Sequence, residues 1–290
     1  MEIPSSINRD ELSGVLIRLR GLFPSLKSAL QKVANVILEQ PEMAVYASVN
    51  EVAAASGVSE ATVMRFCRIL GFRGFQDFKI ALAREMVAPT GRVQEEVAEG
   101  DDTATTVRKV FQTNMAALQD TLEVLNTGAM AGATQVLLHA GQIMIIGVAG
   151  SHPLVDYAGN KFFRLGLNVH CYTDALVMMM AAALLTPQDA LLAVSHSGAT
   201  REVLEIVPVA REAGAKVIAI TNNSLSPLAR ISDLVLVTAS RETRINQEGL
   251  PSRLCQMSII DSLFALMVLA RPDQARDKLA KIEKVIAKEY

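Results

Sequence analysis

The chain has 290 residues, half of them hydrophobic, and a formal net charge of −2. The length suits one large domain or two ordinary ones, and the charge excludes the general basic field that is typical of nucleic-acid-binding proteins. Cys67, Cys171 and Cys255 lie far apart, so the sequence predicts neither a disulfide framework nor a metal site. We expect no secretory signal, no membrane span and a cytoplasmic location.

The first part of the chain is predicted to fold into short helices. Within residues 48–72, apolar positions at helical spacing indicate two helices separated by Gly57. Ser59 stands where the N-cap of the second helix belongs, and Gly71 where its C-cap belongs. Two short helices joined by a glycine turn are typical of a helix-turn-helix unit.

In such a unit the second helix enters the DNA major groove. Arg65 and Arg68 are three residues apart, so they can reach bases or phosphates from one helix face. A small helical bundle with solvated arginines is the alternative that the helical pattern alone leaves open. The predicted DNA-contacting residues are Ser59, Glu60, Thr62, Arg65 and Arg68 on the helix, with Arg73 and Lys79 suited to phosphate contacts beyond it.

The residues of this segment carry a family pattern. Residues 48–79, SVNEVAAASGVSEATVMRFCRILGFRGFQDFK, contain Thr-Val-x-Arg-Phe, Leu-Gly-Phe and Gly-Phe-x-x-Phe-Lys in that order. This sequence resembles the helix-turn-helix of RpiR-type bacterial transcription regulators. The resemblance implies that double-stranded operator DNA is a partner.

A linker is predicted after the helical part. Residues 89–103 contain Pro89, Gly91 and Gly100 together with an excess of acidic residues, and they lack a sustained apolar face. We therefore expect a helix-turn-helix domain over residues 1–88, a linker over 89–103 and a second domain over 104–290.

The second domain alternates apolar strands with helical patterns after one long amphipathic helix. Five strands are predicted, and residues 175–185 are predicted to form a buried helix. The alternation indicates an α/β fold with a doubly wound, mainly five-stranded parallel sheet and helices on both faces. Ligands in such sheets bind beyond the carboxyl ends of the strands. Three polar turns fall at those ends, at Ser151, at residues 195–200 and at residues 221–226.

The stretch LLAVSHSGATREV, residues 191–203, predicts an anion site. The free N–H groups and the dipole of a helix N-terminus favour phosphate or carboxylate. Ser197 and Thr200 add hydroxyl donors, Gly198 permits close approach to the backbone, and Ser195 lies at the strand end. A simple helix cap is the alternative, but the second hydroxyl turn at Ser151 favours the anion site. Without a G-x-G-x-x-G or P-loop motif, we expect a small phosphorylated ligand and no cofactor.

These residues also resemble the sugar isomerase, or SIS, domain. The S-x-S-G-x-T phosphate loop of SIS domains is matched by residues 195–200, and GVAGSH at 147–152 loosely matches an earlier turn. The segment EGLPSRLCQMSIIDSLF, residues 248–264, is similar to the helix that closes the site, with Ser252, Arg253 and Asp261 at familiar places. The resemblance implies a regulator that binds a phosphosugar effector and self-associates as a homodimer or homotetramer.

A phosphosugar aldose–ketose isomerase is the alternative function, since isomerases share this domain. Isomerisation needs a base and an acid; Glu248 is the candidate base, and His152 and His196 are candidate acids. Glu248 could equally contact sugar hydroxyls in a site that only binds. The helix-turn-helix favours a sensor, because an isomerase has no use for one. A third alternative, DNA binding without any ligand, is disfavoured by the hydroxyl loop.

Overall fold

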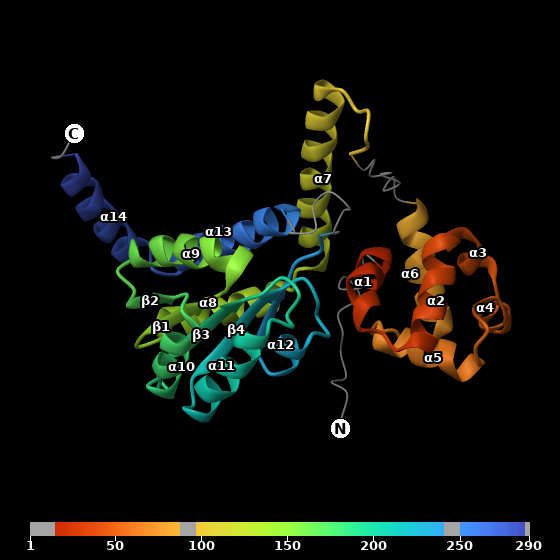
Figure 1. Cartoon of the computed structure of the whole chain (residues 1–290), viewed down its shortest axis with the longest axis horizontal. Helices are drawn as coiled ribbons and strands as arrows, with labels where there is room; N and C mark the ends of the chain where they lie inside the picture. The colour runs from red at the N-terminus through yellow and green to blue at the C-terminus, as the bar shows by residue number, and fades with distance from the viewer. Residues whose placement is uncertain (1–14, 88–96, 241–249, 288–290) are drawn as a thin grey trace. The chain divides into compact units, whose positions relative to one another are not determined.

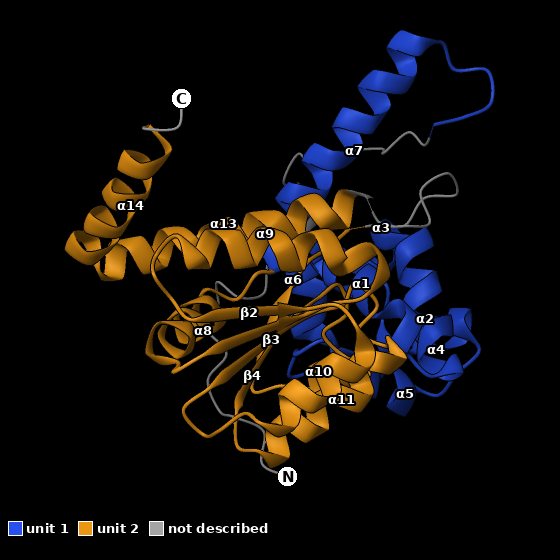
Figure 2. Cartoon of the chain, turned by 60° about the vertical axis from the view of Figure 1, so that its left-hand side comes forward, with its two compact units in different colours: residues 1–124 blue, residues 125–290 orange. Residues whose placement is uncertain are grey.

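The computed structural model describes residues 15–87, 97–240 and 250–287. The chain divides into two compact units, residues 1–124 and residues 125–290 (Figure 1, Figure 2). Glu248 lies outside the described residues.

The first unit is helical throughout its described residues. Its helices are α1 (Val15–Leu22), η2 (Phe23–Ser25), α2 (Ser28–Glu39), α3 (Pro41–Tyr46), α4 (Val49–Ser56), α5 (Glu60–Ile69), α6 (Phe75–Val87) and α7 (Thr103–Val124). Helices α4 and α5 form the predicted helix-turn-helix, and α5 is the helix expected to enter DNA.

Local sequence explains where α4 and α5 begin and end. Ser48 and Glu51 form a capping box at the start of α4, and Gly57 ends it in the left-handed conformation at φ 62°. Ser59 is the N-cap of α5, although its hydroxyl pairs with Thr62 at 3.0 Å and bonds no backbone amide. The predicted C-cap is wrong by one residue, because Leu70 is the C-cap and Gly71 follows it at φ 88°. The left-handed turn needs a glycine just after the cap.

Aromatic rings form the core below α5. Phe78 is fully buried, and the rings of Phe66, Phe72 and Phe75 lie 5.5–6.2 Å from its centroid. These separations are typical of favourable aromatic pairs. The phenylalanines of the family pattern thus hold α5 and α6 together, which leaves the opposite face of α5 for a partner.

The second unit contains a five-stranded parallel sheet, as predicted. Its strands are β1 (Ile143–Ile146), β2 (Val169–Tyr172), β3 (Ala190–Val194), β4 (Lys216–Thr221) and β5 (Leu234–Val237), in the order β2-β1-β3-β4-β5. All four strand pairs are parallel. The order reverses between β1 and β3, which is the switch point where doubly wound sheets bind ligands.

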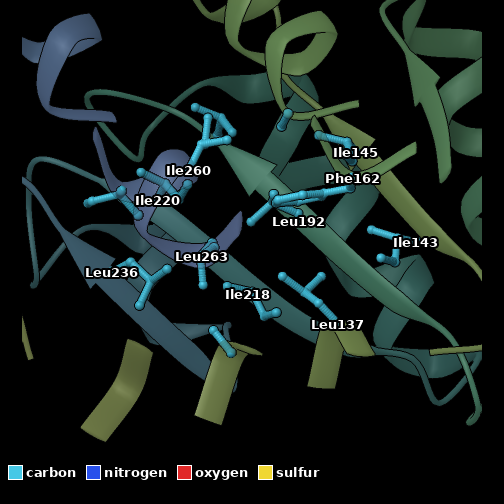
Figure 3. Close-up of a cluster of buried hydrophobic side chains, with 14 of the residues drawn as sticks. Leu137, Ile143, Ile145, Phe162, Leu192, Ile218, Ile220, Leu236, Ile260 and Leu263 are labelled. Atoms are coloured by element: carbon cyan, nitrogen blue, oxygen red, sulfur yellow. The ribbon is translucent and has the colours of Figure 1, made fainter. Parts of the chain in front are cut away.

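Helices cover both faces of the sheet. Helices α8 (Thr127–His139), α9 (His152–Phe163) and α13 (Leu250–Ala270) pack on one face, where Leu137, Phe162 and Leu263 join a continuous apolar core (Figure 3). Helices α10 (Ala175–Ala183), α11 (Arg201–Glu212) and α12 (Pro227–Arg230) pack on the other face. Figure 2 shows α9 and α13 on the side of the sheet opposite α10 and α11. The last helix is α14 (Pro272–Ile286).

The helix predicted over residues 175–185 is present as α10, but the prediction that it is buried is wrong. Helix α10 buries Met178 and Ala182, whereas Leu176, Met180 and Leu184 are 69%, 54% and 77% exposed. The composition predicted burial because the helix is apolar on every side. The sheet offers it only one surface, so the other side of α10 lacks a partner within the described residues.

Helix α13 differs from the expectation that the chain contains no segment able to span a membrane. Its residues 251–270 are long and apolar enough, by length and composition, to cross a membrane. The sequence predicted no such segment, because no apolar run was expected to approach the length of a membrane span. In the structure its face with Ile259, Ile260 and Leu263 is buried against the sheet. The helix therefore serves as a core helix of the second unit.

Candidate functional site

A pocket of about 340 Å³ opens where β1 and β3 end. The volume falls at the lower end of the range for small-molecule sites. Its walls come from the loop after β1, the loop after β3 and the start of α13, which meet at the switch point of the sheet. The lining residues are Val148, Ala149, Gly150, Ser151, His196, Ser197, Thr200, Ser252, Arg253 and Gln256.

Ser195 is a buried residue that stabilises the loop after β3. Its side chain is 2% exposed, and its Oγ lies 2.8 Å from Oγ1 of Thr200. The same Oγ accepts a hydrogen bond of 3.1 Å from the N–H of Gly198. Both contacts join residues within the same loop, so Ser195 stabilises the conformation of the loop. Ser195 does not line the pocket.

Ser197 and Thr200 lie at the N-terminus of α11 and line the pocket. Thr200 is the N-cap residue, but its side chain makes no capping hydrogen bond. The Ser197 hydroxyl accepts from the N–H of Ala199 at 3.2 Å, so its own hydrogen can be donated to a ligand oxygen. Amides that lack a side-chain cap, together with two hydroxyls, suit a phosphate. The simple helix cap that the sequence left open is not what these residues form.

The third polar turn supports the loop and does not line the pocket. Thr221 donates a hydrogen bond of 3.2 Å to the carbonyl oxygen of His196, and the N–H of Asn222 donates to the same oxygen at 2.9 Å. Gly198 adopts φ 61°, and a Cβ at that position would overlap the side chain of Ser226. The glycine is therefore required by the packing of the neighbouring turn as well as by its backbone conformation.

Replacing Gly198 with alanine is expected to destabilise the second unit by roughly 2 to 4 kcal/mol, from a left-handed alanine and an overpacked contact. Chemical denaturation of the whole chain, with hydrogen exchange read at β3 and β4, measures this. Gly57→Ala is the matched control, since Gly57 has φ 62° but no atom within 4 Å of its Cβ position. Equal losses at the two sites would show that the contact with Ser226 contributes nothing.

The loop after β1 forms the facing wall. Ala149 adopts φ 49°, a left-handed conformation that is uncommon for a residue other than glycine. A Cβ on Gly150 would lie 2.6 Å from a guanidinium nitrogen of Arg253, so the arginine packs directly on this glycine. Ser151 precedes α9, makes no capping hydrogen bond with its side chain and lines the pocket.

Helix α13 closes the site from the third side. Ser252 is 1% exposed, and its Oγ lies 2.6 Å from Nδ1 of His196. This bond ties the start of α13 to the loop after β3 and fixes the imidazole in the pocket wall. Arg253 adds a positive charge to the lining, which favours an anionic ligand. The sequence placed Ser252 and Arg253 here only through the family resemblance, and it gave no signal for Gln256.

Two other residues named from the sequence lie away from this pocket. Asp261 accepts hydrogen bonds from Tyr157 at 2.8 Å and from Lys161 at 2.7 Å, which joins α13 to α9. Burial raises the pKa of Asp261, but the bonds from Lys161 and Tyr157 outweigh burial and lower it overall. His152 forms an exposed i,i+4 pair with Asp156 at 3.6 Å and does not line the pocket.

The face of α5 away from the aromatic core carries the predicted DNA-contacting residues. Arg65 and Arg68 are exposed with Ser59 and Glu60, whereas Thr62 is half-buried. Arg73 is exposed and pairs with Asp77 at 2.8 Å. Lys79 donates a hydrogen bond of 2.7 Å to the carbonyl oxygen of Ala47 and lies 5.8 Å over the ring of Phe75. Lys79 thus joins α6 to the end of α3 as well as adding positive charge.

Known proteins resemble both units. The family model of the helix-turn-helix domain, rpiR family, matches residues 13–89, and that of the SIS domain matches residues 136–266. An HTH-type transcriptional regulator of Caldanaerobacter subterraneus subsp. tengcongensis is 34% identical over 256 residues, which span 88% of this chain and 91% of the relative. The HTH-type transcriptional regulator HexR of Pseudomonas aeruginosa is 33% identical over 273 residues, or 94% of this chain and 95% of HexR.

A solved structure aligns with nearly the whole chain. The Vibrio vulnificus NanR protein complexed with ManNAc-6P covers 95% of this chain and 99% of its own, at 27% identity and a TM-score of 0.61. The two family models place the helix-turn-helix domain before the SIS domain. The chain therefore is a transcriptional regulator of the rpiR family, with a helix-turn-helix domain followed by a SIS domain.

Proposed function

We propose that the SIS domain binds a phosphorylated sugar and that this binding modulates the affinity of the helix-turn-helix domain for operator DNA. The observation that carries the proposal is the uncapped N-terminus of α11, which lines a sugar-sized pocket together with two hydroxyls and one arginine. The similarity to a NanR protein complexed with ManNAc-6P supports the same class of ligand.

Different residues bind the phosphate and the sugar of the ligand. The phosphate is held by Ser197, Thr200 and the N–H groups at the start of α11, while Gly198 and Ser195 keep this loop in shape. Ser151 contacts the ligand from the facing wall. Glu248 precedes α13, which lines the pocket, and in this proposal it contacts sugar hydroxyls.

DNA binding is assigned to the exposed face of α5. Arg65 and Arg68 reach base edges or phosphates, and Ser59, Glu60 and Thr62 at the start of the helix lie toward the groove. Arg73 and Lys79 contact phosphates beyond the helix. The ligand changes DNA affinity only to the extent that it binds one arrangement of the DNA-binding domains better than another. The protein acts in the cytoplasm, where operator DNA is present.

The site binds its ligand without converting it. His152 does not line the pocket and is therefore not placed as the ring-opening acid, whereas His196 lines it with its Nδ1 held by Ser252 and is a ligand contact in this proposal. An isomerase that used Glu248 as base would interconvert aldose and ketose phosphates. Wild-type protein incubated with glucose 6-phosphate should therefore form no fructose 6-phosphate. Turnover that is lost in Glu248→Gln would instead assign the isomerase activity.

A ligand panel tests the proposal directly. The whole chain is titrated calorimetrically with sugar phosphates, with the same sugars lacking phosphate, and with inorganic phosphate. The comparison measures how much the phosphate and the sugar each contribute to the affinity. At least one sugar phosphate should bind more tightly than its free sugar and than phosphate alone. Binding of no phosphorylated sugar in the panel would contradict the proposal.

Self-association is also proposed, and the exposed face of α10 supports it. Leu176, Val177 and Met180 on one side of this helix, with Leu184 at its C-cap, form an exposed apolar surface of the kind that marks protein interfaces. A second copy of the SIS domain is the expected occupant, since a dimer brings two recognition helices to two half-sites.

Met180→Glu should convert the oligomer to a monomer, because a carboxylate would be buried in an apolar contact. Light scattering at several protein concentrations measures this. Leu269→Glu is the control, since Leu269 is an exposed apolar residue on α13 outside this surface, at 74%. An unchanged mass in Met180→Glu would remove α10 from the interface.

A further inference from the structure

The side chain of Gln256 is an unsatisfied polar group in the wall of the pocket. It lies on α13, is 1% exposed and lines the pocket with Ser252, one helical turn earlier. Its Nε2 is buried and has no hydrogen-bond partner within the described residues. Among the buried side-chain nitrogen and oxygen atoms of those residues, it alone lacks a partner.

A buried amide without a partner opposes folding, since burial removes its hydrogen bonds to water. Native proteins keep few such groups, and those that persist call for an explanation. Packing does not explain the glutamine here, because a methionine of similar size would fill the same volume without burying an unpaired amide. A ligand that enters the pocket and accepts from Nε2 would remove the deficit.

The position of Gln256 indicates which part of the ligand it meets. The phosphate-binding groups come from the loop after β3 and from the N-terminus of α11, whereas Gln256 comes from α13. His196, from the loop after β3, joins the two walls through its bond to Ser252 of α13. A ligand whose phosphate contacts Ser197 and Thr200 must direct its carbon skeleton along the remaining walls, of which α13 is one.

We propose that Gln256 is a specificity-determining residue, which donates a hydrogen bond from its amide to an oxygen on the carbon skeleton of the ligand, away from the phosphate. This inference rests on the proposed phosphosugar function and adds a recognition role to it. A site built around a hydrogen bond rejects analogues that lack the matching oxygen, because its buried polar group is then left unpaired. Gln256 thereby selects among sugar phosphates that the phosphate loop alone would bind equally.

The test compares wild type with Gln256→Met, using three sugar phosphates and inorganic phosphate as probes. Glucose 6-phosphate, fructose 6-phosphate and N-acetylmannosamine 6-phosphate are titrated, and the tightest wild-type binder is compared. Its affinity should fall roughly 10-fold or more in Gln256→Met, because the bond to the skeleton is lost. The affinity for inorganic phosphate should stay within about twofold, since the phosphate groups are untouched.

Thermal unfolding without ligand supplies a second readout. Gln256→Met should melt at the same temperature as wild type or higher, because it removes an unpaired buried donor. A lower melting temperature would overturn the proposal by showing that the amide is paired inside the chain. Unchanged sugar phosphate affinity, or an equal loss for inorganic phosphate, would overturn it as well. Wild type that binds phosphate but none of the three probes contradicts the proposed function, and with it the role of Gln256.

Discussion

The double variant Ser197→Ala, Thr200→Val is expected to bind sugar phosphates roughly 100-fold more weakly than wild type, or worse. Both hydroxyls line the pocket at the N-terminus of α11, and neither caps that helix through its side chain. Each would donate a hydrogen bond to a charged phosphate oxygen, and such bonds are about twice as strong as neutral ones. Isothermal titration with the tightest wild-type binder measures the loss.

The Thr200 position needs its own control, because its Oγ1 also contacts Oγ of Ser195 at 2.8 Å. Thr200→Ser keeps that hydroxyl and should retain affinity close to wild type. Ser197→Ala alone leaves the Ser195 contact intact and should still weaken binding about 10-fold. If the double variant bound the ligand as tightly as wild type, the phosphate would have to lie elsewhere in the pocket.

Removing the two arginines of the recognition helix is expected to have a similarly large effect on DNA. Arg65→Ala with Arg68→Ala should weaken binding to an operator selected from random duplexes by roughly 100-fold, since a good contact to a base contributes about 1–3 kcal/mol. Both arginines are exposed on α5, away from the aromatic core around Phe78. Fluorescence anisotropy at fixed salt concentration measures the change.

The salt dependence distinguishes what each arginine contacts. A residue that contacts phosphate lowers the salt slope by about one when it is removed and weakens all sequences alike. A residue that reads a base relaxes specificity at one position of the operator. Arg211→Ala, at an exposed arginine of α11 in the second unit, serves as a control for loss of charge outside the helix-turn-helix. Wild-type affinity in the double variant would remove α5 from the DNA interface.

Much of the fold follows from local sequence. Gly57 ends α4 and Ser59 begins α5 because capping and left-handed turns are decided by a few neighbouring residues. The parallel sheet follows from apolar strands that alternate with helices, and residues 143–146 are buried in full as that pattern predicted. The sequence predicts an anion site at residues 195–200 for the same reason, since this loop lies directly between a strand end and a helix start.

The rest depends on contacts between distant segments. Nothing near Gln256 in the sequence shows that it would line one pocket with the loops after β1 and β3, because Gln256 follows those loops by more than fifty residues. The requirement for glycine at position 198 likewise arises from a contact between neighbouring turns, because the side chain of Ser226 leaves no room for a Cβ there. Helix α10 was predicted to be buried from its composition, which gives no information on how much surface the sheet can cover. Tertiary packing decides each of these cases.

The most direct test of the account is the effect of ligand on DNA affinity in the intact chain. Anisotropy titrations of the selected operator, with and without a saturating sugar phosphate, should give different dissociation constants. Linkage requires that operator DNA change the affinity for the sugar phosphate by the same factor. The variant Ser197→Ala, Thr200→Val should retain DNA binding and lose the response to ligand. Equal DNA affinity with and without a sugar phosphate that is shown to bind would contradict the account.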